Sequence, residues 1–148
     1  MPEFGRRDGD DYRAVPFIAK ISGMSEKRKA LSRVAFEVWG GGDLGRLDET
    51  VAPHAVHHDP YDPHGSEGLA GLKKHIAENR AVHPDIRIAV EDQVAEGDRV
   101  VTRWTAYMTH EGREVSLAGV TTERFEGDMI VEAWRCIDML GFLRQIKR

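Results

Sequence analysis

Cysteine is almost missing from the sequence, since Cys136 is the only one in 148 residues. A single thiol cannot form an internal disulfide, so we expect a protein of a reducing compartment, the cytoplasm. Long apolar runs are also missing, because none approaches the roughly 20 residues that a membrane-spanning helix needs. No apolar block follows the N-terminal arginines, as a secretory signal would require.

A dominant charge is lacking as well. The chain carries 21 basic and 25 acidic residues, interleaved along its length, for a formal net charge of −4. Nothing concentrates the positive field that phosphate backbones attract, so we expect no nucleic-acid partner. The length fits one domain with a real core and one pocket, and we expect a soluble protein with a single site.

The first 23 residues show no clear hydrophobic period and end at Gly23, just before Met24. They are either a leader of upstream or tag-like sequence, or an arm that packs its VPFI segment on a neighbour. The sequence alone does not decide between these two. We place the domain at residues 24–148 and leave the first segment out of the functional argument.

Helical spacing follows in three segments. From Ser25 to Trp39, apolar residues recur at i, i+3, i+4, i+7 and i+8, and three glycines then end this helix. Asp43 is placed to cap a short second helix that Pro53 ends, and Ser66 to cap a third that ends near HPD. The apolar positions expected to face inward are Leu31, Val34, Ala35, Val38, Leu44, Leu47, Val51, Leu69, Leu72 and Ile76.

The hydrophobic period changes to two after the third helix. Four runs alternate in this way, at residues 85–96, 98–110, 113–126 and 128–138, and the turns EGD, HEG and EGD separate them. A last apolar segment, residues 139–146, predicts a short C-terminal helix. Helices segregated from an antiparallel meander predict an α+β fold, in which a curved sheet wrapped by the N-terminal helices forms a cone-shaped pocket.

Alternation on the last strand makes Asp138 a candidate site residue, on the same face as Trp134 and Cys136. If that face lines the pocket, loss of water would raise the pKa of Asp138 and let it exchange protons near neutral pH. The alternative is that Asp138 caps the C-terminal helix.

Two neighbouring strands offer further lining residues. Glu123 would be a second carboxylate in the pocket if it faces inward, although a lone glutamate on a strand is usually exposed. Trp104, Ala106 and Met108 form an apolar stripe. Such a stripe suits a pocket wall as well as ordinary core packing.

Histidines gather in the segment HAVHHDPYDPH, residues 54–64. Zinc needs three or four converging ligands, but this spacing fits no zinc template, and His57 and His58 point to opposite sides of an extended chain. We expect no metal. The segment is either a polar loop or one that turns a histidine and Asp59 into the pocket.

Three longer stretches carry a specific order of motifs: AFEVWGGGDLGRLDETVAPHAVHHDP, GLAGLKKHIAENRAVHPDIRIAVEDQVAEGDRVVTRWTAYMTHEG and VTTERFEGDMIVEAWRCIDMLGFLRQI. From about Ser25 to Ile146 the chain resembles the SnoaL-like polyketide cyclase family, within the ketosteroid-isomerase and nuclear-transport-factor-2-like superfamily. The resemblance implies a curved antiparallel sheet, wrapped by helices around a deep pocket.

The resemblance also implies an activity, the closure of a polyketide ring by intramolecular aldol condensation without metal or organic cofactor. It implies that Asp138 removes a carbon-bound proton, and it selects His58, with Asp59, as the pocket-facing histidine. The implied partner is a small hydrophobic carbonyl compound. The residues expected to bind it are Trp104, Trp134, Glu123, Met108 and Asp59.

The sequence departs from the family in two places. GVTTERF offers only threonines and Glu123 where relatives often carry a histidine or aspartate, and THEGREVS is short where relatives carry a longer loop. The first hypothesis is therefore a cyclase or isomerase that uses enolate chemistry on a different substrate. The alternatives are an epoxide hydrolase or hydratase, if Glu123 faces inward, and a non-catalytic binding protein, if Asp138 only caps its helix.

A second copy of the chain is the other expected partner. An open sheet exposes a broad outer face, and such faces are commonly buried against a copy of themselves. Val100, Ala118 and Val120 are expected on that face, so we expect a homodimer.

Overall fold

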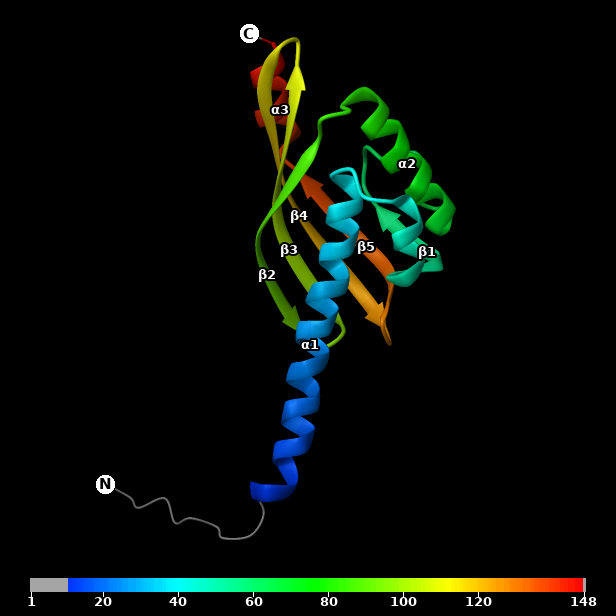
Figure 1. Ribbon diagram of the computed structural model, residues 1–148, viewed down its shortest axis with the longest axis vertical. Helices are drawn as coiled ribbons and strands as arrows, with labels where there is room; N and C mark the ends of the chain where they lie inside the picture. Colours follow the sequence, from blue (N-terminus) through cyan, green and yellow to red (C-terminus); the bar gives the residue numbers. More distant parts are fainter. Residues whose placement is uncertain (1–10, 148) are drawn as a thin grey trace, which may run out of the picture.

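The computed structural model describes residues 11–147, with side chains from Gly23 onward. The first element, α1 (Asp11–Trp39), is one helix that runs through Gly23 and Met24 (Figure 1). The expected helix start near Ser25 is therefore wrong, whereas the end at Trp39 is confirmed. The leader stays a prediction, and residues 1–10 lie outside the described part.

A curved five-stranded sheet, in the order β1-β5-β4-β3-β2, forms the other layer. Four of its strands form the predicted antiparallel meander, and their bounds agree with the prediction to within two residues. Glycines with positive φ angles make the three tight turns, at Gly97, Gly112 and Gly127. The four strands are β2 (Arg87–Glu96), β3 (Arg99–His110), β4 (Arg113–Glu126) and β5 (Met129–Ile137).

The fifth strand, β1 (Val51–His58), was not expected. It pairs in parallel with β5 at one edge of the sheet. The prediction that places Val51 in the short helix and ends that helix at Pro53 is therefore wrong. An edge strand tolerates a proline, because part of its backbone has no neighbour to bond. Residues 54–58 of the histidine-rich segment therefore belong to a strand, and the strand sets the direction in which their side chains point.

The cap of the short second helix and the bounds of the C-terminal helix agree with their predictions. In η1 (Leu44–Glu49), a 3-10 helix, the Asp43 Oδ1 accepts a hydrogen bond from Gly45 N at 2.9 Å and caps the first turn. The C-terminal helix, α3 (Met139–Ile146), has the predicted bounds.

The start of α2 (Gly68–Val82) differs from its prediction. No side chain caps this helix, so the expected Ser66 cap is wrong. Gly68 has a φ of 67°, and a Cβ there would lie 2.2 Å from the Pro53 carbonyl oxygen. The close approach of α2 to β1, rather than a capping side chain, sets where this helix begins.

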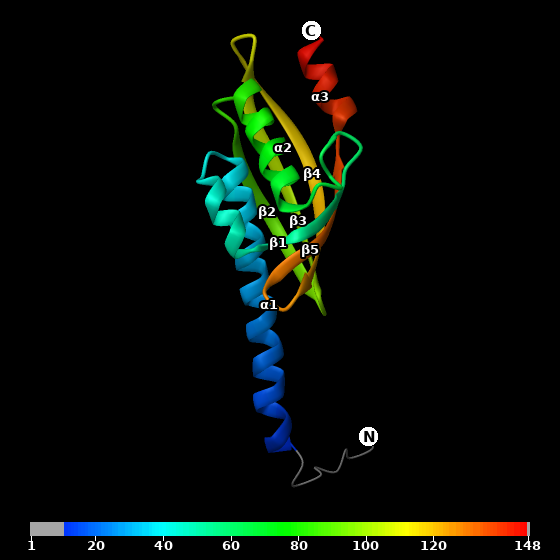
Figure 2. The same cartoon turned by 90° about the vertical axis from the view of Figure 1, so that its right-hand side faces the viewer.

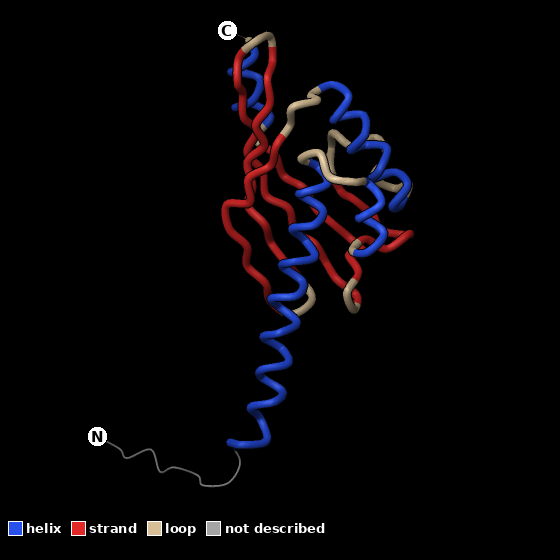
Figure 3. Tube along the Cα trace, in the orientation of Figure 1, coloured by secondary structure: helices blue, strands red, loops and turns tan. Residues whose placement is uncertain are grey.

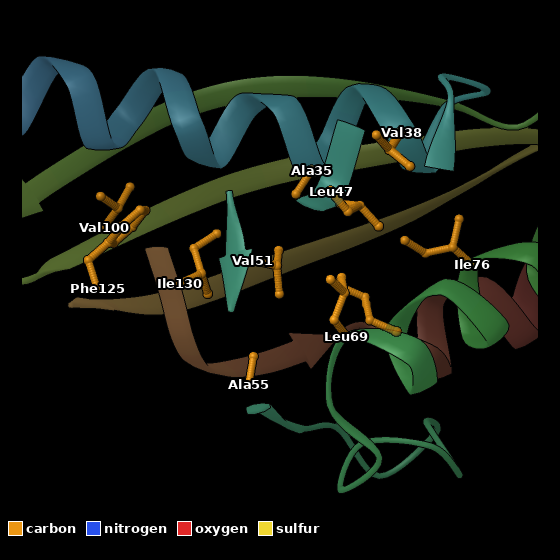
Figure 4. Close-up of a cluster of buried hydrophobic side chains, with 11 residues drawn as sticks. Ala35, Val38, Leu47, Val51, Ala55, Leu69, Ile76, Val100, Phe125 and Ile130 are labelled. Carbon is orange, nitrogen blue, oxygen red and sulfur yellow. The ribbon is translucent and has the colours of Figure 1, made fainter. Parts of the chain in front are cut away.

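Helices α1 and α2 lie on one side of the sheet. α1 crosses its concave face and α2 covers β1, as Figures 1 and 3 show. No helix in the described part is long and apolar enough to span a membrane. The main core fills the space between these helices and the sheet (Figure 4), and its members are Ala35, Val38, Leu47, Val51, Ala55, Leu69, Leu72, Ile76, Val100, Phe125 and Ile130.

Candidate functional site

A pocket of about 190 Å³ lies between the concave face of the sheet and the helices. One part of its wall comes from β2, β3 and β4, and another from α1 and α3. Most of the lining is apolar, so a bound molecule would lose most of its contact with water. The apolar lining includes Phe36, Ile88, Trp104, Met108, Leu117 and Phe142.

Trp104 forms the best-fixed part of this wall. Its Nε1 donates to Thr121 Oγ1 at 2.9 Å, and only 5% of the residue is exposed. A Cβ at Gly119 on the neighbouring strand would lie 2.3 Å from the indole ring, so glycine is needed for the ring to lie against β4. The structure places Trp104 and Met108 on the pocket wall, as expected, while their role in binding stays a prediction.

An ion pair stands at the polar end of the pocket. Arg135 Nη1, on β5, donates to Asp59 Oδ2 at 2.9 Å, and the side chains are only 12% and 4% exposed. The guanidinium carbon also lies 5.1 Å from the centre of the Trp39 ring. Burial strengthens such a charge-assisted hydrogen bond and fixes its direction. Asp59 therefore lies where the sequence predicted it, but Arg135 was not found.

His75, on α2, lies beside this pair and lines the pocket. Its Nδ1 is 3.5 Å from Asp62 Oδ1, and its ring meets the Trp39 ring edge-on with centroids 5.3 Å apart. Burial lowers the pKa of His75, although the Asp62 carboxylate opposes this. The imidazole is therefore neutral near pH 7 and can accept a proton.

His57 is the second buried histidine, and His58, which the resemblance to the family selected, faces outward; neither lines the pocket. His57 on β1 is 8% exposed, and burial, aided by Arg135, lowers its pKa to about 4. His58 points outward, where Nε2 meets Glu132 Oε2 at 2.7 Å and the ring stacks on Trp134 at 5.4 Å. Because side chains alternate along a strand, one residue separates the inner from the outer face.

Asp138 lies outside the pocket. Its Oδ1 accepts a hydrogen bond from Gly141 N at 2.9 Å, so the carboxylate caps α3, and the residue is exposed. The sequence left open whether Asp138 lines the pocket or caps the C-terminal helix, and the structure shows that it caps the helix. The predicted pocket position of Asp138 is wrong, because the inner face of β5 carries Arg135 and Ile137 instead.

Trp134 shares the outer face of β5 with Asp138. Its ring lies between the His58 ring and Arg99, whose guanidinium carbon is 5.0 Å from the ring centre. It therefore does not line the pocket, and its predicted place on the pocket wall is wrong.

Glu123 faces inward, against the expectation that a lone glutamate on a strand is exposed. It is 5% exposed, and burial raises its pKa to about 7, although the Ser32 hydroxyl and the Arg135 charge oppose the shift. Its Oε1 is buried without a hydrogen-bond partner among the described residues. Glu123 is not among the residues that line the pocket, so its expected place there is wrong.

The histidine-rich segment does not converge on one point. His54 and His58 are exposed, His57 is buried, and His64 pairs with Glu67 and Glu78. Within residues 23–147, no group of three or more histidine, cysteine, aspartate or glutamate side chains is arranged to hold a metal ion.

Known proteins resemble the chain in sequence and fold. The model of the SnoaL-like polyketide cyclase family matches residues 29–146. No curated protein matches the chain. A candidate polyketide cyclase from Acidithiobacillus ferrooxidans is 31% identical, with a TM-score of 0.72, over 82% of this chain and 94% of its own.

Two Streptomyces proteins have a similar structure. IdmH, a candidate polyketide cyclase from Streptomyces antibioticus, is 28% identical, with a TM-score of 0.73, over 82% of this chain and 99% of its own. AclR, a candidate hydroxylase from Streptomyces galilaeus, is 28% identical, with a TM-score of 0.70, over 83% of this chain and 82% of its own.

A largely apolar, partly open pocket with a polar end, held between a curved sheet and helices, places the protein in the class of nuclear-transport-factor-2-like folds with a pocket of small-molecule size. Within that class, the chain belongs to the SnoaL-like polyketide cyclase family. Its structural relatives include a candidate cyclase and a candidate hydroxylase, so membership supports a cyclase- or isomerase-type role on a small molecule without naming the reaction.

Proposed function

We propose that the protein is a cofactor-independent cyclase or isomerase that removes a proton next to the carbonyl group of a compact substrate. The observation that carries this proposal is the meeting of a neutral, buried His75 and the Arg135–Asp59 pair at the polar end of an apolar pocket. A base and a cationic donor at one end of a dry site are what enolate chemistry needs.

His75 is the proposed base. The proposal takes the tautomer with its proton on Nδ1, 3.5 Å from Asp62 Oδ1, rather than the one in which Nδ1 accepts from Asn79 Nδ2 at 3.4 Å; Nε2 then keeps a lone pair for the substrate. Nε2 takes the carbon-bound proton, and the electrons of the broken C–H bond form the enolate. In an isomerase, the imidazolium returns the proton to another carbon. In a cyclase, the enolate carbon attacks a second carbonyl group and the imidazolium protonates the alkoxide.

Arg135 is the proposed stabiliser of the enolate oxygen. Asp59 holds one side of the guanidinium at 2.9 Å, so the donor is oriented before the substrate binds. Preorganised donors in a water-poor site stabilise developing charge far better than water does. At about 190 Å³ the pocket lies below the usual ligand range of roughly 300–1,000 Å³, which supports a mono- or bicyclic substrate.

The proposed base differs from the one that the resemblance implied. Asp138 caps α3 and His58 faces outward, so neither is placed to touch a molecule in the pocket. If the pocket had no other base, the position of Asp138 as a helix cap would favour the hypothesis of a non-catalytic binding protein. His75 supports an enzyme instead, because it supplies a base from another element.

Proton exchange in deuterium oxide tests this proposal directly. We expect the wild type to speed deuterium incorporation next to the carbonyl of 2-tetralone, and His75→Gln to lower that rate about 10²- to 10⁴-fold. Asp138→Asn is the matched control, because asparagine also caps helices and should leave the rate nearly unchanged. A rate lost in Asp138→Asn and kept in His75→Gln would refute the proposal.

The inward position of Glu123 favours hydration as a second candidate function. A buried carboxyl group with a raised pKa can activate water, as an epoxide hydrolase or hydratase requires. Glu123 lies off the pocket lining, which is why this function ranks second. Diol formation from styrene oxide by the wild type, but not by Glu123→Gln, would support it.

We also propose a homodimer formed through the outer face of the sheet. Ala118 and Val120 are exposed there, whereas Val100 is fully buried in the core, so its expected place on that face is wrong. Analytical ultracentrifugation at micromolar concentration tests this. A single species of 16.6 kDa would refute the homodimer.

A further inference from the structure

The last helix, α3, is held by few contacts although it forms part of the pocket wall. None of its residues is buried, and Leu140 is 60% exposed. At eight residues it is also too short to persist as an isolated helix in water. Its position therefore depends on the contacts at its two ends.

The first attachment lies where β5 stops. Asp138 N donates to Ala118 O at 2.9 Å, which is the last backbone bond between this part of the chain and β4. The Asp138 carboxylate then caps the helix at Gly141 N, and a Cβ at Gly141 would lie 2.2 Å from Asp138 Oδ2. This tight turn ties the start of α3 to the sheet.

The second attachment lies at the far end of the helix, where Arg113 Nη2 of β4 donates to Gln145 O at 3.1 Å and the Gln145 side chain bonds to Ser116. β4 continues beyond the end of β5, and there the Gln145 amide takes the place of a neighbouring strand. Its Oε1 accepts from Ser116 N at 2.9 Å, and its Nε2 donates to Ser116 O at 2.8 Å. Figure 2 shows α3 lying beside this end of β4.

These two attachments hold α3 over the pocket. Met139 and Phe142 line the pocket, and Phe142 and Ile146 pack against the apolar cluster that contains Trp104. If the Gln145 contacts break while those at Asp138 remain, Phe142 can swing away from the pocket. Opening would also break the bond from Arg113 to Gln145 O and expose Phe142 and Ile146, which are only partly buried.

We propose that α3 is a hinged lid on the pocket, and that Gln145 is the latch that controls access for apolar small molecules. A glutamine suits this role because its amide both accepts from and donates to the Ser116 peptide. In the open state both groups bond to water, so opening requires far less free energy than unfolding. The inference concerns access to the pocket and holds for any reaction inside it.

Hydrogen exchange and probe binding test the latch without any catalysis. In Gln145→Ala we expect the Ser116 amide and the α3 amides to exchange about 10- to 30-fold faster, the factor that two net hydrogen bonds contribute. 2-Naphthol, a planar analogue of an enol, should associate faster by a similar factor in stopped-flow fluorescence of Trp39 and Trp104, which line the pocket.

Two further variants make the test specific. Gln145→Glu keeps the size of the side chain and the acceptor for Ser116 N but loses the donor to Ser116 O, so its rates should lie between those of the wild type and Gln145→Ala. Arg144→Ala, at an exposed position of the same helix, should change neither rate. Unchanged exchange at Ser116 in Gln145→Ala would overturn the proposal, and so would faster exchange throughout β2 to β5, which would make Gln145 part of the global fold. Failure of 2-naphthol to bind the wild type would overturn it too.

Discussion

The inner and outer faces of β1 and β5 carry similar residue types in opposite environments. Inside, His57 and Arg135 are buried beside Asp59, and burial lowers the pKa of His57 to about 4. Outside, His58 pairs with Glu132 and stacks on Trp134 in contact with water. A step of one residue along a strand therefore separates a desolvated site from an ordinary polar surface.

The largest difference between the faces should appear when an arginine is removed from each. Arg135→Met leaves the buried Asp59 carboxylate without its partner, so the free energy of unfolding should fall by about 3–5 kcal/mol. Arg99→Met, on the outer face, loses a cation–π contact with Trp134, worth about 0.5–1 kcal/mol, and an exposed ion pair with Asp98 at 3.9 Å, which adds little. Urea denaturation measures both. Equal losses would mean that Arg135 is no better shielded from water than Arg99.

The two glutamates should give pH dependences of opposite sign. Burial raises the pKa of Glu123 to about 7 in the folded state from 4.5, so the folded protein binds more protons than the unfolded chain between these values. The contribution of Glu123 to stability should therefore fall as the pH rises, by roughly 2–3 kcal/mol between about pH 5 and pH 8, while the lowered pKa of His57 and of His75 gives contributions that rise with pH. Glu123→Gln should remove this fall, as denaturation at a series of pH values will reveal.

Glu132 on the outer face is the matched control. The hydrogen bond from His58, followed by the contacts with Arg124, lowers the pKa of Glu132. Its contribution to stability is therefore present above the usual carboxylate pKa and lost as the pH falls. Glu132→Gln should produce a small effect in that direction. A change like that of Glu123→Gln would contradict the assignment of the two faces.

A smaller effect is expected at a glycine of the inner face. Gly119→Ala would put a methyl group 2.3 Å from the Trp104 ring, so the ring must move and the protein should lose about 1–3 kcal/mol of stability. Ala118→Ser, at the next residue and on the exposed outer face, should be nearly neutral. Denaturation curves of the two variants give the comparison, and a neutral Gly119→Ala would show that Trp104 is free to move.

Most of the fold could be predicted from the sequence. The four strands of the meander have strict alternation and glycine turns, and α3 is a compact apolar segment, so local rules are sufficient there. β1 was missed because it contains Pro53 and an irregularity between Val51 and Val56, so burial does not alternate in its first half. Its partner is β5, more than seventy residues away, and local patterns carry no information about such a pairing.

The candidate site was predicted less well. The sequence correctly predicted which residues of β5 share a face. Both faces of this strand mix apolar and polar residues, however, so the pattern did not show which face turns inward. Arginine is seldom buried, which is why Arg135 was passed over. His75 was not predicted as a site residue because its contacts with Asp62 and Trp39 form only through tertiary packing, which local sequence patterns do not show.

An NMR titration of the individual imidazole groups tests the division between the two faces most directly. We expect His57 to stay neutral down to about pH 4 and His75 to titrate below the usual 6.5, whereas His64, bound to Glu78 and Glu67, should titrate above it. His58→Gln should leave the His75 curve unchanged. If His57 and His75 instead titrate at or above 6.5, the inner face is open to water, and the proposed site of proton transfer is wrong.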